Sequence, residues 1–152
     1  MEISQIVQQI QYTLAPAIMI SSSALLLLGF QNKFSALFNR FRMLNQEKRS
    51  LVEKTNRSKT EGLRLENLEE QLPRLARRAA HVKNAIVLAY AAIISFVMTS
   101  VLLFLHPYAN SRLLHATLAF CLLGLLLILT GAFFMIAEVL ISFNILTLER
   151  KS

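Results

Sequence analysis

The 152-residue sequence contains no aspartate and no tryptophan, and it has only one cysteine, three prolines and four glycines. It also lacks the motifs G-x-x-x-x-G-K, G-x-G-x-x-G, H-E-x-x-H and G-x-S-x-G, which nucleotide-binding loops, zinc proteases and serine hydrolases require. Cys121 lies inside an apolar run without a partner, which excludes a disulfide framework and predicts a small packing residue. We therefore expect no enzyme, no cofactor and no metal site.

Charged side chains are missing from three long stretches, residues 14–30, 86–105 and 113–137. A helix rises about 1.5 Å per residue, so a hydrocarbon core of about 30 Å needs about 20 residues. The second and third stretches are long enough, and the first becomes so if its helix continues past Asn32 while Lys33 extends its ammonium to the headgroups. The sequence predicts an all-α membrane protein with transmembrane helices at 14–33, 84–105 and 113–147, the last including a cytoplasmic extension.

Positive charge is concentrated between the first two predicted spans, and this sets the expected orientation. Six glutamates accompany the basic residues within 31–83, and this segment carries the whole net charge of +7. Cytoplasmic loops carry the excess of lysine and arginine, so we expect the N-terminus and the loop 106–112 outside, and the tail 148–152 inside. A signal peptide is the competing interpretation of residues 1–30, but no basic n-region or small-residue cleavage site is present. Thirteen of the sixteen basic residues lie in this stretch: Lys33, Arg40, Arg42, Lys48, Arg49, Lys54, Arg57, Lys59, Arg64, Arg74, Arg77, Arg78 and Lys83.

Residues 34–83 carry the pattern of a cytoplasmic antiparallel helical hairpin between spans one and two. Two series of apolar residues advance in steps of three and four, the first interrupted by Lys48, and a polar turn at 55–62 separates them. We expect Pro73 to kink the second arm or to begin a new helix. The series are Leu37, Phe41, Leu44 and Leu51, and then Leu65, Leu68, Leu72, Leu75, Ala79 and Val82.

The charges of this hairpin have three interpretations. The simplest is a solvated face around two seams that bury each other. Arginines next to the spans also suit anionic lipid headgroups, whereas nucleic-acid binding lacks any groove-reading or stacking motif. The headgroup candidates are Arg40 and Arg42 beside the first span and Arg74, Arg77, Arg78 and Lys83 beside the second.

Residues 1–13 precede the first predicted span, and we expect them to form an element of their own. Isoleucine and valine recur at helical spacing opposite glutamines, which predicts a short amphipathic helix on the outer leaflet, with Pro16 near the start of the crossing helix. A frayed chain end is the alternative.

Small residues predict the packing faces of the spans. A stripe on the third span runs through Thr117, Cys121, Gly124, Ile128 and Gly131, and Ala85, Ala89 and Ala92 form a comparable stripe on the second. Small stripes let helix backbones approach closely in lipid, so we expect a tight bundle or a homo-oligomer. The same steps continue to Glu138 and Ser142.

Glu138 is the one acidic residue within the predicted spans, and a carboxylate there is costly unless it is paired or hydrated. We favour an ion pair with Lys33, Arg40 or Arg42 at the inner boundary over ion conduction or proton relay. Together with Ser142, these residues define the candidate polar site at the inner mouth.

Two runs of sequence carry a resemblance to a known family. Residues 14–34 read LAPAIMISSSALLLLGFQNKF, and Asn39-Arg40-Phe41-Arg42-Met43-Leu44 follows. These resemble the beginning of a bacterial membrane family known as domain of unknown function 2721, with Arg40, Arg42 and Leu44 matching an Arg-x-Arg-x-Leu stretch; Asn39 stands where that family commonly has aspartate. The resemblance implies a multi-pass protein of the bacterial inner membrane and supplies no mechanism.

Three functions follow as hypotheses. We favour a homo-oligomeric helical assembly with ion conduction as its candidate activity, in which Glu138 and the neighbouring arginines set the charge of the inner mouth. The topology also looks like that of YidC-like insertases, which would need a hydrophilic groove lined by residues 21–23, Asn32, Lys33 and Glu138. A scaffold whose hairpin docks a soluble partner would need exposed apolar groups on that hairpin.

Overall fold

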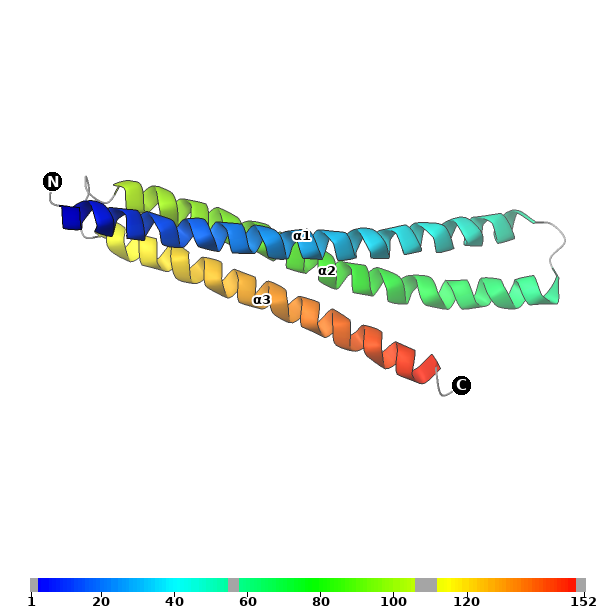
Figure 1. Cartoon of the computed structure of the whole chain (residues 1–152). Helices are drawn as coiled ribbons and strands as arrows, with labels where there is room; N and C mark the ends of the chain where they lie inside the picture. Colours follow the sequence, from blue (N-terminus) through cyan, green and yellow to red (C-terminus); the bar gives the residue numbers. More distant parts are fainter. Residues whose placement is uncertain (1–2, 55–57, 106–111, 150–152) are drawn as a thin grey trace.

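Three long helices make up the described part of the chain. The computed structural model describes residues 3–54, 58–105 and 112–149, with α1 at Ile3–Glu53, α2 at Lys59–Leu105 and α3 at Arg112–Glu149. Each helix contains a stretch long and apolar enough to cross a membrane. The hairpin of α1 and α2 extends well past the C-terminal end of α3 (Figure 1). The predicted all-helical architecture is confirmed; the loop 106–111, the turn residues 55–57 and the tail 150–152 lie outside the described residues.

Helix α2 is the centre of the bundle. It packs along both α1 and α3, which make much less contact with each other. Ala85, Ala89 and Ala92 are completely buried on α2, as the small-residue stripe predicted. Because alanine projects only a methyl group, the neighbouring helices can approach the α2 backbone closely.

The apolar series of residues 34–83 form the interface between the two hairpin arms. Leu37, Leu75 and Val82 belong to one buried cluster, with Phe41 and Leu44 packed against it. Nearer the turn, Leu51 and Leu68 are also buried. The spacing of these residues therefore identified the buried face of each arm.

The hairpin turn is shorter than the polar segment 55–62 predicted. Helix α1 ends at Glu53 and α2 begins at Lys59. The backbone N–H of Ser58 donates to Glu61 Oε2 at 3.0 Å, and Gly62 N–H donates to the Ser58 carbonyl at 3.1 Å. Ser58 and Glu61 thus provide half of a capping box, a start signal that is present in the sequence. Gly62 lies in the helix and not in the turn.

The two prolines inside helices bear on two expectations. Helix α2 is continuous through Pro73, so of the two outcomes expected there the start of a new helix is wrong, and α1 is continuous through Pro16 from Ile3 onward. Residues 3–13 therefore extend the crossing helix instead of forming a separate one. An internal proline costs about 3 kcal/mol, but neighbouring helices offset this cost where they hold the segment in place.

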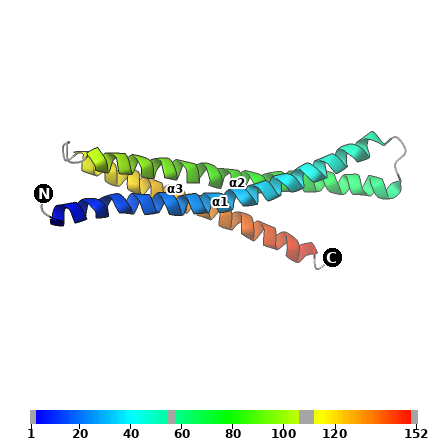
Figure 2. The same ribbon diagram turned by 45° about the horizontal axis from the view of Figure 1, so that its top comes forward.

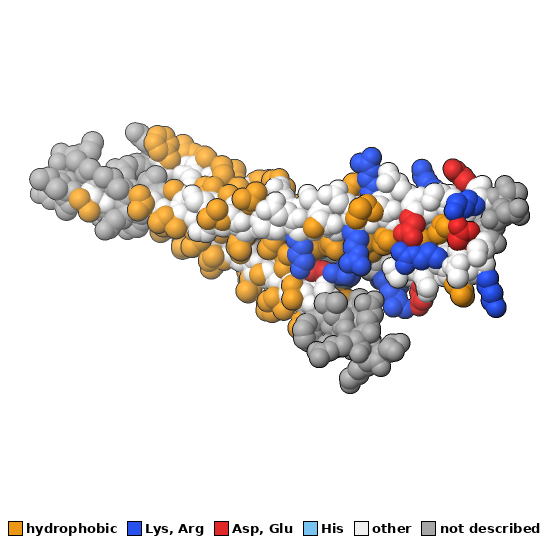
Figure 3. Space-filling view, turned by 45° about the vertical axis from the view of Figure 1, so that its right-hand side comes forward, with side chains coloured by type: hydrophobic (Ala, Val, Ile, Leu, Met, Phe, Trp, Pro, Cys, Tyr) orange, Lys and Arg blue, Asp and Glu red, His pale blue; other side chains and the backbone are white. Residues whose placement is uncertain are grey.

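The outer surface of the bundle divides into two regions. Large apolar side chains are exposed on all three helices, among them Leu25 at 71%, Phe104 at 78% and Leu126 at 60%. Hydrophobic side chains dominate one half of the visible face, and charged ones gather over the hairpin half (Figure 3). An exposed apolar surface of this extent is typical of a protein that contacts a lipid bilayer.

We expect Gly124→Ala to destabilise the bundle and Gly62→Ala not to do so. A Cβ at position 124 would lie 2.6 Å from the buried Phe96 ring, whereas one at position 62 meets nothing within 4 Å. Overpacking costs about 1–3 kcal/mol, and both substitutions gain the same helix propensity. Denaturation midpoints in detergent measure the difference, and Phe96→Leu should rescue Gly124→Ala. Equal midpoints for the two glycine variants would contradict the close α2–α3 contact.

Candidate functional site

The helical register of α3 brings Glu138 into the interior of the bundle. Thr117, Gly124, Gly131 and Glu138 are all buried at intervals of seven residues, which is close to two helical turns. Gly124 faces the Phe96 ring, and a Cβ at Gly131 would lie 3.3 Å from the Ala85 carbonyl oxygen. The contacts that bring the α3 backbone onto α2 therefore also place the Glu138 carboxylate in the bundle, where its exposed fraction is 0%.

Glu138 binds one cation from each of the other two helices. Arg78 of α2 donates from Nε and Nη2 to Oε1 at 3.1 and 3.0 Å. Lys33 of α1 places its ammonium against Oε2, which has no other hydrogen-bonding partner among the residues that the structure describes. The cluster joins all three helices at one level and links α1 directly to α3.

Ser142, one turn further along α3, completes the cluster. Its Oγ accepts a hydrogen bond from Arg78 Nη2 at 2.6 Å. The single hydroxyl hydrogen is within reach of both the Glu138 backbone carbonyl, at 2.9 Å, and Oε1, at 2.8 Å. Ser142 therefore orients the guanidinium and the carboxylate toward each other.

The cluster carries unequal charge. Two cations surround one carboxylate, so its net charge is +1. Glu138 is fully enclosed, whereas the side chains of Lys33 and Arg78 are 31% and 19% exposed. Burying an ion costs several kcal/mol, which good geometry and additional hydrogen bonds must offset. Oε1 meets both requirements, because it accepts hydrogen bonds from Arg78 and lies within hydrogen-bonding distance of the Ser142 hydroxyl. Oε2 faces the Lys33 ammonium.

The structure gathers only part of the predicted inner-mouth set. Lys33 and Ser142 lie against Glu138, while Arg40 and Arg42 are exposed and are not among its partners. Arg40 is two turns beyond Lys33, about 10 Å further along α1. The second cation is Arg78, which the sequence placed among the headgroup residues. The sequence did contain an indication of this, because Arg78 lies between Leu75 and Val82, which are both buried, and is therefore close to the packed face of α2.

The remaining headgroup candidates are located differently. Arg74 forms an ion pair with Glu70 on its own helix. Arg77 and Lys83 are exposed on α2.

Ion pairs also connect the two arms of the hairpin. Arg64 binds Glu47 with two hydrogen bonds, of 2.8 and 3.2 Å, and Lys54 binds Glu61 at 2.7 Å. Lys48, which interrupts the apolar series, reaches Glu69 at 2.9 Å. Part of the hairpin charge thus stabilises the pairing of the arms.

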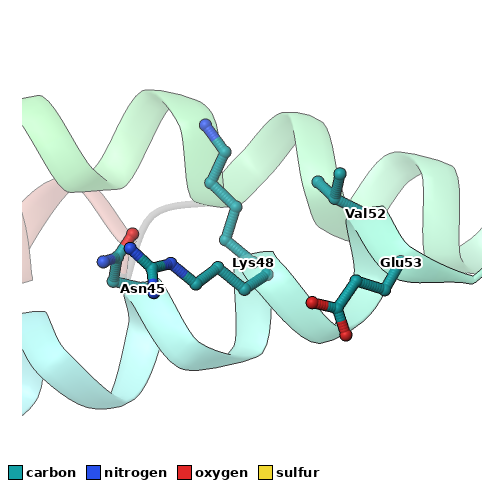
Figure 4. A pocket seen from close by; sticks show the side chains of 5 residues that line it. Asn45, Lys48, Val52 and Glu53 are labelled. Carbon is teal, nitrogen blue, oxygen red and sulfur yellow. The ribbon is translucent and has the colours of Figure 1, made fainter.

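A shallow hollow of about 300 Å³ lies on the α1 arm of the hairpin. Figure 4 shows Lys48 extended toward α2, with Val52 and Glu53 further along α1. The lining residues all come from α1, and they combine basic, acidic, amide and apolar side chains. They are Asn45, Lys48, Arg49, Val52 and Glu53.

Ligands for a metal ion do not gather in the described parts of the chain. Across residues 3–54, 58–105 and 112–149, no three His, Cys, Asp or Glu side chains come together. His81 lies 6.0 Å from the Phe134 ring, measured between centroids, and Cys121 is half-buried on the α3 stripe.

Three membrane-length helices joined by a buried ion-pair cluster define a multi-pass helical membrane protein. The chain belongs to the family described as "Protein of unknown function (DUF2721)", whose model matches residues 13–148. This match includes the hairpin and the whole Glu138 cluster. No curated protein and no solved structure matches the chain.

We expect the double substitution Lys33→Met with Arg78→Met to destabilise the bundle by about 3–5 kcal/mol, the cost of an unpaired buried charge. Adding Glu138→Gln should recover most of this loss, because no charge then remains to be compensated. Denaturation midpoints in detergent measure both effects. If the triple variant is less stable than the double variant by the same amount that Glu138→Gln alone destabilises the wild type, the three residues do not act as one cluster.

Proposed function

We propose that the chain is a membrane scaffold of the bacterial inner membrane, with its N-terminus outside and its hairpin and C-terminus in the cytoplasm. A three-helix anchor holds the basic hairpin beyond the bilayer, where a soluble partner docks. The observation that carries this proposal is the continuity of α1 and α2 from the apolar region into the hairpin. The 20 residues that follow Lys33, up to Glu53, extend the hairpin about 30 Å past the cluster.

The use of Glu138 and the small-residue stripe favours a scaffold over a pore. A pore needs polar and small groups around an axis that ions can reach. Here Glu138 is enclosed by Lys33 and Arg78, and Gly124 and Gly131 pack against α2 of the same chain. These groups are occupied inside one chain, so the proposal assigns the chain neither a conduction path through Glu138 nor a catalytic step.

An insertase would need an open hydrophilic groove on the cytoplasmic side. Two candidate lining residues, Ser23 and Glu138, are buried. Ser21 and Ser23 donate to the backbone carbonyls of Ala17 and Met19 in their own helix. This arrangement gives the insertase less support than the scaffold.

Exposed apolar groups on the hairpin support docking. Met43 on α1 is 63% exposed and Leu63 on α2 is 56% exposed, although both lie outside the long apolar runs. Val52 is 49% exposed at the hollow of Figure 4. Such side chains supply the apolar contacts that a protein interface needs at its centre.

Photo-reactive residues introduced at Met43 and Leu63 should form adducts with a soluble protein in cells. The same residue at Leu126, which is 60% exposed on the apolar part of α3, should react with lipid and serves as the control. Adducts are identified by mass. Adducts at neither hairpin position, or only adducts with the mass of two chains, would contradict docking of a soluble partner.

Homo-oligomerisation is a second candidate, favoured by one face of α1. Ala15, Ser22, Gly29 and Ala36 are spaced by seven residues, and all four are exposed. A Cβ at Gly29 would meet nothing within 4 Å. This small face is left uncovered by α2 and α3, and a second copy packing through it would bury it.

If this face joins two copies, Gly29→Leu should convert an oligomer to a monomer, while Gly62→Leu on the hairpin should not. Mass measurement in detergent gives the state of each variant. Ion flux is then measured in liposomes made from the same preparations. An oligomer that is a pore conducts ions, and an oligomer that is only an assembly does not. A wild-type chain that is monomeric excludes the oligomer, and flux that Glu138→Gln abolishes would favour the pore over the scaffold.

A further inference from the structure

The Glu138 cluster presents only positive charge to its surroundings. The carboxylate has an exposed fraction of 0%, while Lys33 and Arg78 remain partly accessible. Arg78 uses Nε and Nη2 on Glu138 and Ser142, which leaves Nη1 outside these contacts. The Lys33 ammonium has three hydrogens and directs its ion pair at one oxygen. An anion could therefore bind both cations without displacing Glu138.

Exposed apolar side chains lie within five residues of Lys33 on α1 and within two residues of Glu138 on α3. Phe38 on α1 is 54% exposed, and Val139 and Leu140 on α3 are 51% and 60% exposed. Beyond the cluster, α3 diverges from the hairpin in both ribbon views (Figures 1 and 2). The cluster thus lies between the apolar runs and the charged hairpin, a position that suits the phosphate of a lipid headgroup.

We propose that Lys33 and Arg78 form a binding site for the phosphate of one acidic phospholipid, whose acyl chains lie against Phe38 and Val139. Glu138 holds the two cations in place and limits the excess charge to +1, which matches one phosphodiester. Guanidinium and ammonium groups are the usual protein partners of phosphate. A free phosphate ion shares this chemistry, but it would gain nothing from the flanking apolar groups.

This site differs from general attraction of the basic hairpin to an anionic surface. Arg77 and Lys83 are exposed, and their interactions with headgroups are diffuse and screened by salt. Lys33 and Arg78 are held by a common carboxylate from a third helix, so they are already ordered before a lipid arrives. The site contains none of the proposed docking residues of the hairpin, so a failure of lipid binding would leave the scaffold proposal intact.

Binding of phosphatidylglycerol and phosphatidylcholine to the full chain in detergent, followed by native mass spectrometry, tests the site. The wild-type chain should retain one phosphatidylglycerol in preference to phosphatidylcholine. Lys33→Gln should lower this affinity about fivefold, because one unit charge near a membrane surface has an effect of that size. Lys59→Gln at the start of α2 is the matched control and should change nothing.

The double variant Arg78→Gln with Glu138→Gln gives the decisive result, because it keeps the wild-type net charge but removes one of the two proposed phosphate ligands. It should bind phosphatidylglycerol more weakly than the wild type, and wild-type affinity in this variant would overturn the site. Equal losses in Lys33→Gln and Lys59→Gln would overturn the site in favour of diffuse attraction. Inorganic phosphate that displaces the lipid at equal concentration would overturn the lipid assignment.

Discussion

The ion pairs of Glu138 with Lys33 and Arg78 fix how the three helices align. Apolar side chains in lipid gain little from one register over another, because lipid tails are as apolar as leucine. A shift of one helical turn, about 5.4 Å, would separate the buried carboxylate from both cations. The cost of an unpaired buried charge makes such a shift unfavourable. Depth, register and the proximity of α1 to α3 therefore depend on this cluster.

Close packing supports the same arrangement. Gly124 accommodates the Phe96 ring and Gly131 accommodates the Ala85 carbonyl, so the α3 backbone lies near α2 where Glu138 follows. The central position of α2 depends on its alanines, which leave room on both sides. Because α1 and α2 continue without a break into the hairpin, the cluster also sets where the hairpin arms leave the bundle.

Charge therefore has separate roles along the molecule. At the tip, pairs such as Glu47 with Arg64 hold the hairpin arms together. At the cluster, one anion and two cations join the helices and leave an excess of one positive charge. A scaffold needs both properties, a rigid hairpin and a fixed position in the bilayer. The lipid site that we infer would add a headgroup contact at the level where the helices meet.

The sequence by itself determined the three apolar helices, the hairpin arms and the faces that become buried. It determined these because hydrophobic spacing reports directly which side of a helix avoids water. It also placed Glu138 on the packing stripe and included Lys33 among its partners. The Ser58 cap was readable too, as a Ser-x-x-Glu start signal.

Only the tertiary structure decided which neighbour occupies each buried face. Periodicity defines a face on one helix but not the helix that covers it, so Arg78 replaced Arg40 and Arg42 beside Glu138. In the same way, packing along α2 kept the helix continuous through Pro73, where local propensity favours a break. The small residues of α3 could have served an oligomer, and the contacts with Phe96 and Ala85 show that α2 of the same chain uses them.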